Sequence, residues 1–379
     1  MFFIKLDIIL TKKYLYLYAN AVNMSKMLND MLNLEILENI CSGVGVDINI
    51  SALSKFLKKH RNTIKDQVKA LFENKIINKP IYPFKWLYEE YPLFVIARAD
   101  LPKNEAIEQF LKDDEHIFGA FHVRDEEYNT LLIEYHKDIF TYGEWKKEIV
   151  QKNKIPPRDI RFPAHSLFFS NWNIIKYQPY SPIFIIENKY KNGEELTIGD
   201  FKINELCFQI LKKLVMGEGI QTNENLLSKT LSVHRKTIER RISTLIKEKI
   251  VGKPTCRFPK FFVPPNQILD YCLMEIKKSK DKILKAFQSD PHIPLAYEAN
   301  IGRYNYLLFK VFLNVEDSFK WEERYDNRFP DCIGAMKKLF LSPQMTYSID
   351  QQKVSLNIIR KRKESLRGKE LIEAIKGPG

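Results

Sequence analysis

Two stretches of the chain are nearly the same: "LKKHRNTIKDQVKALFENKIINKP" at residues 57–80 and "LSVHRKTIERRISTLIKEKIVGKP" at residues 231–254. They align without a gap, 174 residues apart. Downstream the match continues at an offset of 176 residues, which places Trp145 on Trp321. A change of loop length by two residues explains the shift. The sequence therefore predicts a tandem duplication of a unit of about 140 residues, the size of one or two small domains.

Each copy opens with three helical patterns followed by a basic turn. Apolar residues recur at helical spacing in 32–40 and 206–214, and short second helices are expected near 51–57 and 225–231. After a break of three residues a third amphipathic helix begins, and short strands around a Lys-Pro turn follow it. Helix, helix, tight turn, helix and basic hairpin is the pattern of a winged helix-turn-helix.

The third helix of each copy is the one expected to enter a DNA groove. Its outer face mixes cations, which suit phosphate, with amide, acidic and guanidinium groups, which suit base edges. A charged outer face is also typical of any solvated helix, but the preceding break and the basic wing favour DNA. The candidate DNA-binding residues are Arg61, Asn62, Thr63, Lys65, Asp66, Lys69 and Lys79 in the first copy, and His234, Arg235, Lys236, Thr237, Glu239, Arg240, Ser243, Lys253 and Arg257 in the second.

His60 and His234 stand at the entry to the third helix in the two copies. Neither has Asp or Cys residues nearby at the spacing of a metal site. A capping or packing role is therefore expected for both, in preference to a ligand or catalytic role.

The second part of each copy alternates short apolar strands with two helices. In the first copy "LFVIARA" at 93–99 and "YNTLLIEYH" at 128–136 are expected strands, and "KNEAIEQFLK" at 103–112 is an expected amphipathic helix. The second copy repeats the order from "ILDYCLMEI" at 268–276 onward. The order is βαββαβ, that of a ferredoxin-like unit. The fold class expected is α+β, with two tandem units that each join a winged helix-turn-helix to a ferredoxin-like domain.

This combination resembles the Lrp/AsnC regulators, the leucine-responsive and asparagine-responsive type. Their ligand domain carries a turn reading Gly-x-Tyr-Asp-x-Leu-Leu, and residues 302–308 read GRYNYLL. The resemblance implies an amino-acid effector near Gly302, Tyr304 and Asn305, and self-association through the ferredoxin-like domains. In the first copy the turn at 126–132 reads EEYNTLL, without the glycine, and there a plain β-hairpin is the preferred interpretation.

Seven segments are expected along the chain. They are an N-terminal extension 1–27, a winged helix-turn-helix 28–88, a ferredoxin-like domain 89–172, an exposed linker 173–202, a second winged helix-turn-helix 203–263, a second ferredoxin-like domain 264–350 and a basic C-terminal tail 351–379. The first segment is interpreted either as an N-terminal extension or as a segment translated from too early a start. The tail is interpreted either as an arm on phosphate or as a soluble end.

Composition limits the classes of function. Sixty Lys and Arg against 47 Asp and Glu give a net charge of +13, which favours an anionic partner. Five cysteines without a CxxC pair indicate neither a metal site nor a disulfide framework, and they favour a reducing, cytoplasmic compartment. Apolar runs are too short to span a membrane, so no membrane partner is expected.

Catalytic motifs are missing as well. The sequence has no Walker loop, GxGxxG, HExxH or GxSxG, and no set of acid, base and nucleophile recurs in both copies. The chain is therefore predicted not to be an enzyme and to need no cofactor. The function expected is that of a sequence-specific, double-stranded DNA-binding transcriptional regulator that acts as a pseudo-dimer. The alternative left open is an architectural or partner-binding winged-helix protein that does not regulate promoters.

Overall fold

The computed structural model describes residues 27–28, 30–42, 46–47, 49–83, 90–123, 128–152, 165–170, 173–178, 180–181, 183–195, 197–198, 201–217, 221–222, 224–248, 250–257, 267–342 and 353–376. The expected N-terminal extension, apart from Met27, lies outside these residues, as do residues 126 and 127 of the turn at 126–132.

The first sheet belongs to a βαββαβ domain. Its four strands are antiparallel neighbours in the order β3-β4-β2-β5. This is the strand order of a ferredoxin-like fold. The elements are β2 (Leu93–Ala99), α6 (Glu105–Asp113), β3 (Ile117–His122), β4 (Thr130–His136), α7 (Ile139–Lys152) and β5 (His165–Ser170).

The second βαββαβ domain has the corresponding order β13-β10-β12-β11, and β6 (Ile174–Tyr177) extends the sheet at its β11 edge. Its elements are β10 (Ile268–Ile276), α12 (Lys280–Ser289), β11 (Leu295–Ile301), β12 (Tyr304–Phe312), α13 (Val315–Arg328) and β13 (Ile333–Leu341). The stretch expected as an exposed linker thus supplies an edge strand. Lys176 on this strand is buried and donates to the carbonyl oxygens of Phe287 (3.2 Å) and Asp290 (2.6 Å) at the end of α12.

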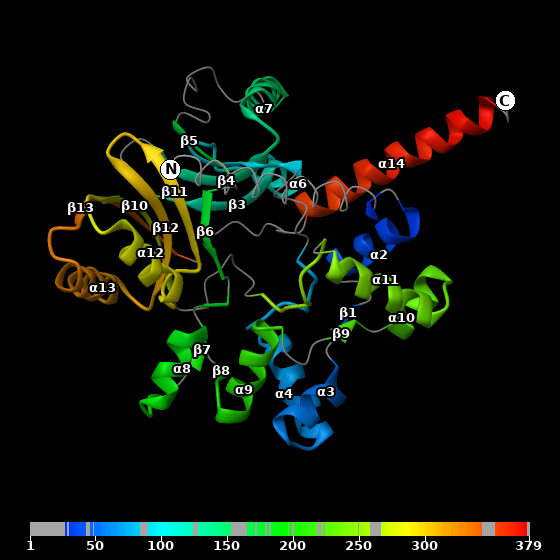
Figure 1. The fold of residues 1–379 in the computed structure, drawn as a ribbon, viewed down its shortest axis with the longest axis horizontal. Helices are drawn as coiled ribbons and strands as arrows, with labels where there is room; N and C mark the ends of the chain where they lie inside the picture. The colour runs from blue at the N-terminus through cyan, green and yellow to red at the C-terminus, as the bar shows by residue number, and fades with distance from the viewer. Residues whose placement is uncertain are drawn as a thin grey trace, which may run out of the picture.

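The two sheets pack face to face, and helices cover their outer faces (Figure 1). The rings of Phe94 and Tyr297, one from each sheet, stack with centroids 4.8 Å apart. Because side chains alternate along a strand, Tyr135 on β4 faces the other sheet while Leu132 faces α6 and α7. Glu134 and His136 have the same parity as Leu132, so the helix side of the first sheet holds them as well.

The three-helix modules are built by exchange between the two halves of the chain (Figure 1). The first helix of each half packs on the second and third helices of the other half. We call them module A, made of α9 (Glu205–Val215), α3 (Ile50–Leu57) and α4 (Arg61–Glu73), and module B, made of α2 (Met31–Cys41), α10 (Glu224–Leu231) and α11 (Arg235–Lys247).

Short backbone pairings join the modules. β1 (Val46–Asp47) pairs with β9 (Gln221–Thr222), one strand from each half. The amides of Ile81 and Thr255 each donate to the other residue's carbonyl oxygen at 2.7 Å. The predicted capping role of the two histidines is confirmed: the ring nitrogens of His60 and His234 accept from backbone amides in the first turns of α4 and α11, at 3.3 Å.

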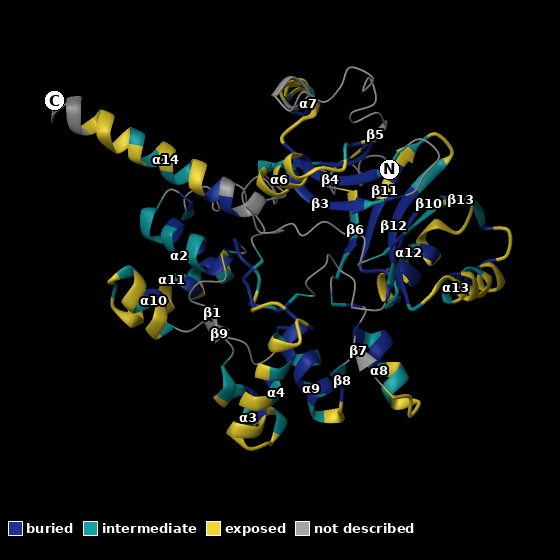
Figure 2. Ribbon diagram, turned by 180° about the vertical axis from the view of Figure 1, so that it is seen from behind, coloured by how far each residue is buried: buried dark blue, intermediate teal, exposed yellow. Residues whose placement is uncertain are grey.

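The remaining elements connect these parts. α8 (Ile183–Lys191), β7 (Thr197–Ile198) and β8 (Phe201–Lys202) lead into α9. The expected basic tail contains α14 (Lys353–Lys376), which packs on α2 and β3 at its start and then leaves the body of the molecule (Figure 2). Among the described residues, no helix combines the length and the apolar character needed to cross a membrane.

Candidate functional site

The outer faces of α4 and α11 carry most of the residues expected to bind DNA. Ile64, Val68 and Leu71 on α4 are buried, which turns the polar residues between them outward. Arg235 lies 3.9 Å from Glu224, a long and exposed ion pair. Exposed are Arg61, Asn62, Thr63, Lys65, Asp66, Lys69 and Lys79 around α4, and His234, Arg235, Lys236, Glu239, Arg240, Ser243 and Lys253 around α11.

Two of the expected DNA-binding residues are less accessible. Thr237 and Arg257 are half-buried. The Arg257 carbonyl oxygen accepts from the Asn78 amide at 2.8 Å, so this residue lies where the two halves of the chain meet. Arg257 is therefore placed at the junction between the modules.

The predicted effector turn is fastened to its own sheet. Gly302 has φ +59°, a left-handed conformation that favours glycine at this hairpin. The Asn305 side chain accepts from the amide of Ile276 and donates to its carbonyl oxygen, both at 2.8 Å. Asn129 makes the same pair of bonds to Leu101 in the first domain. The amide group of Asn305 is therefore already engaged by the backbone, and Tyr304 is half-buried beside it.

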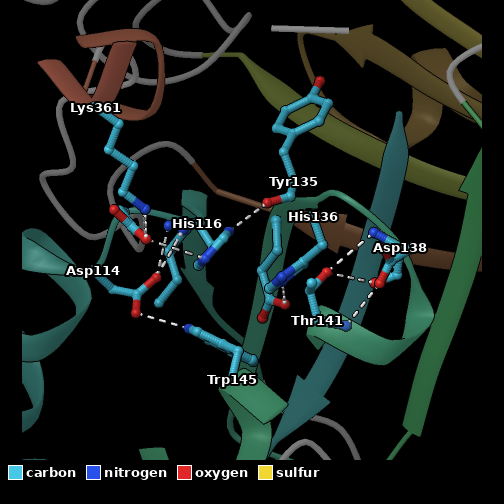
Figure 3. Close-up of polar contacts among 11 residues, drawn as sticks. Asp114, His116, Tyr135, His136, Asp138, Thr141, Trp145 and Lys361 are labelled. Carbon is cyan, nitrogen blue, oxygen red and sulfur yellow. Dashed lines mark hydrogen bonds and ion pairs between the residues drawn. The ribbon is translucent and has the colours of Figure 1, made fainter. Parts of the chain in front are cut away.

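A cluster of titratable side chains, missed in the sequence, lies between the first sheet and α7 (Figure 3). The His116 and His136 rings stack with centroids 4.3 Å apart and planes 12° apart. His116 Nδ1 lies 2.8 Å from the Tyr135 carbonyl oxygen, so in the neutral ring Nδ1 carries the proton. His136 Nε2 lies 3.0 Å from Glu134 Oε2.

An acidic residue and α7 hold this cluster in place. Asp114 accepts from the amides of His116 (2.8 Å) and Ile117 (3.1 Å) through Oδ1. Its other oxygen accepts from the indole of Trp145 at 2.8 Å. At the start of α7, Asp138 Oδ1 accepts from the Thr141 amide at 2.7 Å, which caps the helix. The imidazole of His116 is therefore fixed between the sheet and α7, with one edge open to solvent.

Burial makes the pair of Glu134 and His136 neutral. Both side chains have no exposed surface. Burial raises the pKa of Glu134 well above its ordinary value, and nearby Asp114 raises it further. Burial lowers the pKa of His136 to about 4, against the opposing effect of nearby Asp114 and Asp138. Burial also lowers the pKa of His116, and the neighbouring His136 lowers it further because the two rings disfavour being protonated together.

Two polar atoms of this pair have no hydrogen-bond partner in the described structure: Glu134 Oε1 and His136 Nδ1. Such atoms are costly to bury without a partner. The arrangement can accept or release a proton through either imidazole, and His116 is the group nearer to solvent, with 14 % of its side chain exposed. It therefore has the composition of a general acid–base site.

The corresponding position of the second domain has different chemistry. His292 and Asp290 repeat the contacts of His116 and Asp114: His292 Nδ1 lies 2.9 Å from the Val311 carbonyl oxygen, and Asp290 accepts from the Trp321 indole at 2.7 Å. Lys310 and Phe312, however, stand where the first domain has Glu134 and His136. Lys310 Nζ lies 3.0 Å from Asp270 Oδ2, and both side chains are fully buried.

Comparison with known proteins finds no family model that matches the chain and no matching curated protein. Solved structures do match. Two are of the siroheme decarboxylase NirDL: one matches with TM-score 0.46 and 11 % identity over 90 % of this chain and 99 % of that one. The other, a complex with an iron-uroporphyrin III analogue, matches with TM-score 0.47 and 11 % identity over 89 % and 100 %. E. coli AsnC matches with TM-score 0.26 and 15 % identity over 43 % of this chain and 89 % of its own.

The described elements make an α+β fold of antiparallel sheets, as the sequence predicts. The comparisons bear against one prediction. The expectation that the chain is not an enzyme is wrong on this finding, because the solved structures that match about nine tenths of the chain are those of a decarboxylase. The expectation required an acid–base set in both copies, whereas His136 has no counterpart in the second domain, where Phe312 takes its place.

Within the described residues, no group of three or more His, Cys, Asp or Glu side chains is arranged to hold a metal ion. The cysteines at 41, 207, 256, 272 and 332 are buried and unpaired with one another. Burial raises the pKa of Cys41 to about 12, so this thiol stays protonated and unreactive at neutral pH.

Proposed function

We propose that the chain binds double-stranded DNA through modules A and B, as a sequence-specific regulator whose tandem halves act as a pseudo-dimer. The observation that carries this proposal is the exposure of both recognition helices. The inner face of α4 is buried against α9, and the inner face of α11 is buried against α2. Their outer faces, rich in Arg and Lys, remain exposed in the described structure. A recognition helix needs such a face to enter a major groove.

The composition of the two faces supports a DNA partner over a solvated surface. The expected contacts on α11 include three cations and one acidic residue: Arg235, Lys236, Arg240 and Glu239. Three cations can each replace counterions on phosphate, which gives affinity at moderate salt. The acidic residue can accept a hydrogen bond from a cytosine amino group in the major groove.

The two faces differ, so the two halves of the site need not share a sequence. Lys65 of α4 aligns with Glu239 of α11, and Asp66 aligns with Arg240. Two recognition helices in one chain are expected to read half-sites about 34 Å apart, one helical turn of DNA, or a multiple of it. The expected operator is therefore bipartite and asymmetric.

The test is selection of duplex DNA from a random pool at near-physiological salt. Wild type, Arg61→Ala and Arg235→Ala are run together, with Lys282→Ala as a control that removes one exposed cation from α12 of the second βαββαβ domain. We expect a bipartite motif of which each arginine variant loses one half, while the control keeps both. Binding that fades with salt and selects no motif favours the architectural alternative, and a lack of binding overturns the proposal.

A second candidate function is catalysis at the histidine cluster of the first βαββαβ domain. It rests on one observation, that two stacked imidazoles and a protonated carboxyl group lie together, with one imidazole reaching the surface. Such a set can donate a proton to a carbon atom that has lost carbon dioxide, since that carbon keeps the electron pair of the broken bond. A carboxylate-bearing tetrapyrrole, the class of substrate named for the decarboxylase above, is the substrate to try first.

The assay mixes the protein with siroheme under reducing conditions and follows mass loss of the tetrapyrrole. His116→Gln and His136→Phe are the test variants, and His292→Gln is the matched control in the second domain. We expect turnover in wild type and in the control, and loss of turnover in both test variants. Equal turnover in all four proteins removes the cluster from the reaction, and absence of turnover in wild type removes this substrate.

A further inference from the structure

Four consecutive cations of α14 each lie beside a carboxylate of another element. Arg360 Nε and Lys363 Nζ lie 3.7 Å and 3.0 Å from Glu38 on α2 of module B. Arg362 pairs with Glu90, which precedes β2 in the first βαββαβ domain. Because neighbouring residues of a helix point about 100° apart, such a run reaches two sides of the helix.

The fourth cation, Lys361, pairs with Glu115, which precedes β3 (Figure 3). The clasp, as we call residues 360–363, therefore ties module B to the first domain. Leu356, Ile358 and Ile359 anchor the preceding turns of α14 in the apolar core. Beyond the clasp Leu366 still packs on the core, and the last turns are exposed, with 63 % of Leu371 and 54 % of Ile372 accessible to solvent.

One oxygen of Glu115 has two partners. Oε1 pairs with Lys361 Nζ and lies 3.5 Å from His116 Nε2. In the neutral ring Nδ1 donates to the Tyr135 carbonyl oxygen, so Nε2 presents a lone pair to the carboxylate. When His116 is protonated, Nε2 becomes a second cationic donor to the same oxygen, which weakens the hold of that oxygen on Lys361.

The charged and titratable groups around His116 come from every element packed against it. Asp114 and Glu115 precede β3, Glu134 and His136 belong to β4, Tyr91 precedes β2 and Lys361 belongs to α14. From α7 the indole of Trp145 packs against the His116 ring, and Tyr142 packs against His136. Burial and the stacked His136 oppose protonation of the His116 ring and lower its pKa, whereas Asp114 and Glu115 favour the protonated ring. In this set the contact with α14 is made by Lys361.

Module B continues the connection to the recognition helix. Asp30, the cap of α2, lies 3.0 Å from Arg241 on α11. A movement of α2 away from α14 therefore acts on α11 directly. α2 and α11 also share the core of module B.

We propose that α14 is a proton-sensitive clasp: neutral His116 leaves Glu115 to Lys361 and holds module B on the first domain, and protonated His116 takes Glu115 and loosens the module. The consequence for DNA, altered orientation of α11, rests on the proposed function. The clasp itself does not, because it is a contact within the free protein.

The experiment is hydrogen exchange of the full chain without DNA, read by mass spectrometry at about pH 7.5 and about pH 5, with rates corrected for intrinsic exchange. In wild type we expect peptides of α2 and α14 to exchange faster at the acidic pH. Lys361→Ala is expected to raise exchange of both peptides at the higher pH, by severalfold. Lys369→Ala, which removes an exposed lysine of the same helix, is the matched control and is expected to change nothing.

Two further variants assign the sensor. Glu115→Gln alters a partly exposed side chain and is expected to show loosened α2 and α14 at both pH values. His116→Gln is expected to keep its protection at the acidic pH. The proposal is overturned by unchanged protection in Lys361→Ala and Glu115→Gln, or by acid loosening that persists in His116→Gln. Since no DNA is present, these outcomes are distinct from failure of the DNA selection.

Discussion

The exchange of first helices can be tested with one matched pair of variants. Leu37 on α2 and Leu211 on α9 occupy corresponding positions of the two halves, and neither has exposed surface. Leu37 belongs to the core that includes Ile238 and Leu245 of α11, whereas Leu211 belongs to the core that includes Ile64 of α4. Leu→Ala at such a site costs about 2–5 kcal/mol, from lost transfer energy and the cavity left behind.

That cost sets the size of the expected signal. Local opening of the affected module should become roughly 30-fold to several thousand-fold more frequent, because about 1.4 kcal/mol corresponds to a factor of ten. Hydrogen exchange of individual helices measures this opening. Leu37→Ala is expected to speed exchange in α10 and α11, and Leu211→Ala in α3 and α4, each across the halves of the chain.

The opposite assignment refutes the reasoning. If Leu37→Ala loosens α3 and α4 and Leu211→Ala loosens α10 and α11, each half folds its own three helices and the exchange does not occur in solution. If either variant speeds hydrogen exchange equally in modules A and B, the two modules do not have separate cores. Each variant is the control for the other, since the two changes remove the same atoms.

Two further predictions concern buried charge. Lys310→Met leaves Asp270 buried beside an apolar side chain. The free energy of unfolding, measured by urea denaturation, is therefore expected to fall by about 3–5 kcal/mol, and the double variant with Asp270→Val should recover most of that free energy. If the double variant is as unstable as Lys310→Met, the prediction is wrong. The lowered pKa of His136 means that, below its ordinary pKa, the unfolded chain takes up a proton that the folded chain refuses. Stability therefore falls as the pH drops from about 6.5 to about 4. His136→Phe, which copies Phe312, is expected to flatten this fall in stability. The raised pKa of Glu134 has the opposite effect on stability, and it has that effect in the wild type and in the variant alike. If the pH profile of the melting temperature is the same in both proteins, the prediction is wrong.

Local pattern was enough to place the helices of the modules. Ile64, Val68 and Leu71 recur at helical spacing, and α4 extends over Arg61–Glu73 around them. The same kind of pattern indicated a buried face for residues 32–40 but not the surface it meets. The first helices of the two halves have similar apolar faces, so periodicity alone cannot distinguish packing within a half from exchange between halves. That choice depends on long-range geometry.

The candidate catalytic site was harder to predict for a different reason. Glu134 and His136 alternate with apolar residues on a strand buried on both faces, and polar residues in such a strand are a signal. A search for catalytic residues that recur in both copies does not find Glu134 and His136, because Lys310 and Phe312 replace them in the second copy. The edge strand β6 was hidden likewise, since its partner β11 lies more than one hundred residues further along the chain.

The difference between the two βαββαβ domains indicates where a proton can be exchanged. In the second domain Lys310 stays charged: burial lowers its pKa, but Cys272, Asp270 and Glu322 together raise it above its ordinary value. A buried ion pair of this kind is fixed in its protonation state, because neutralising either partner leaves the other uncompensated. In the first domain the pair is neutral, so proton movement between His136 and Glu134 leaves no net buried charge. His116 connects that pair to solvent and to α14. We therefore expect proton-dependent chemistry or sensing at the pair of Glu134 and His136 in the first domain, and not at the pair of Asp270 and Lys310 in the second.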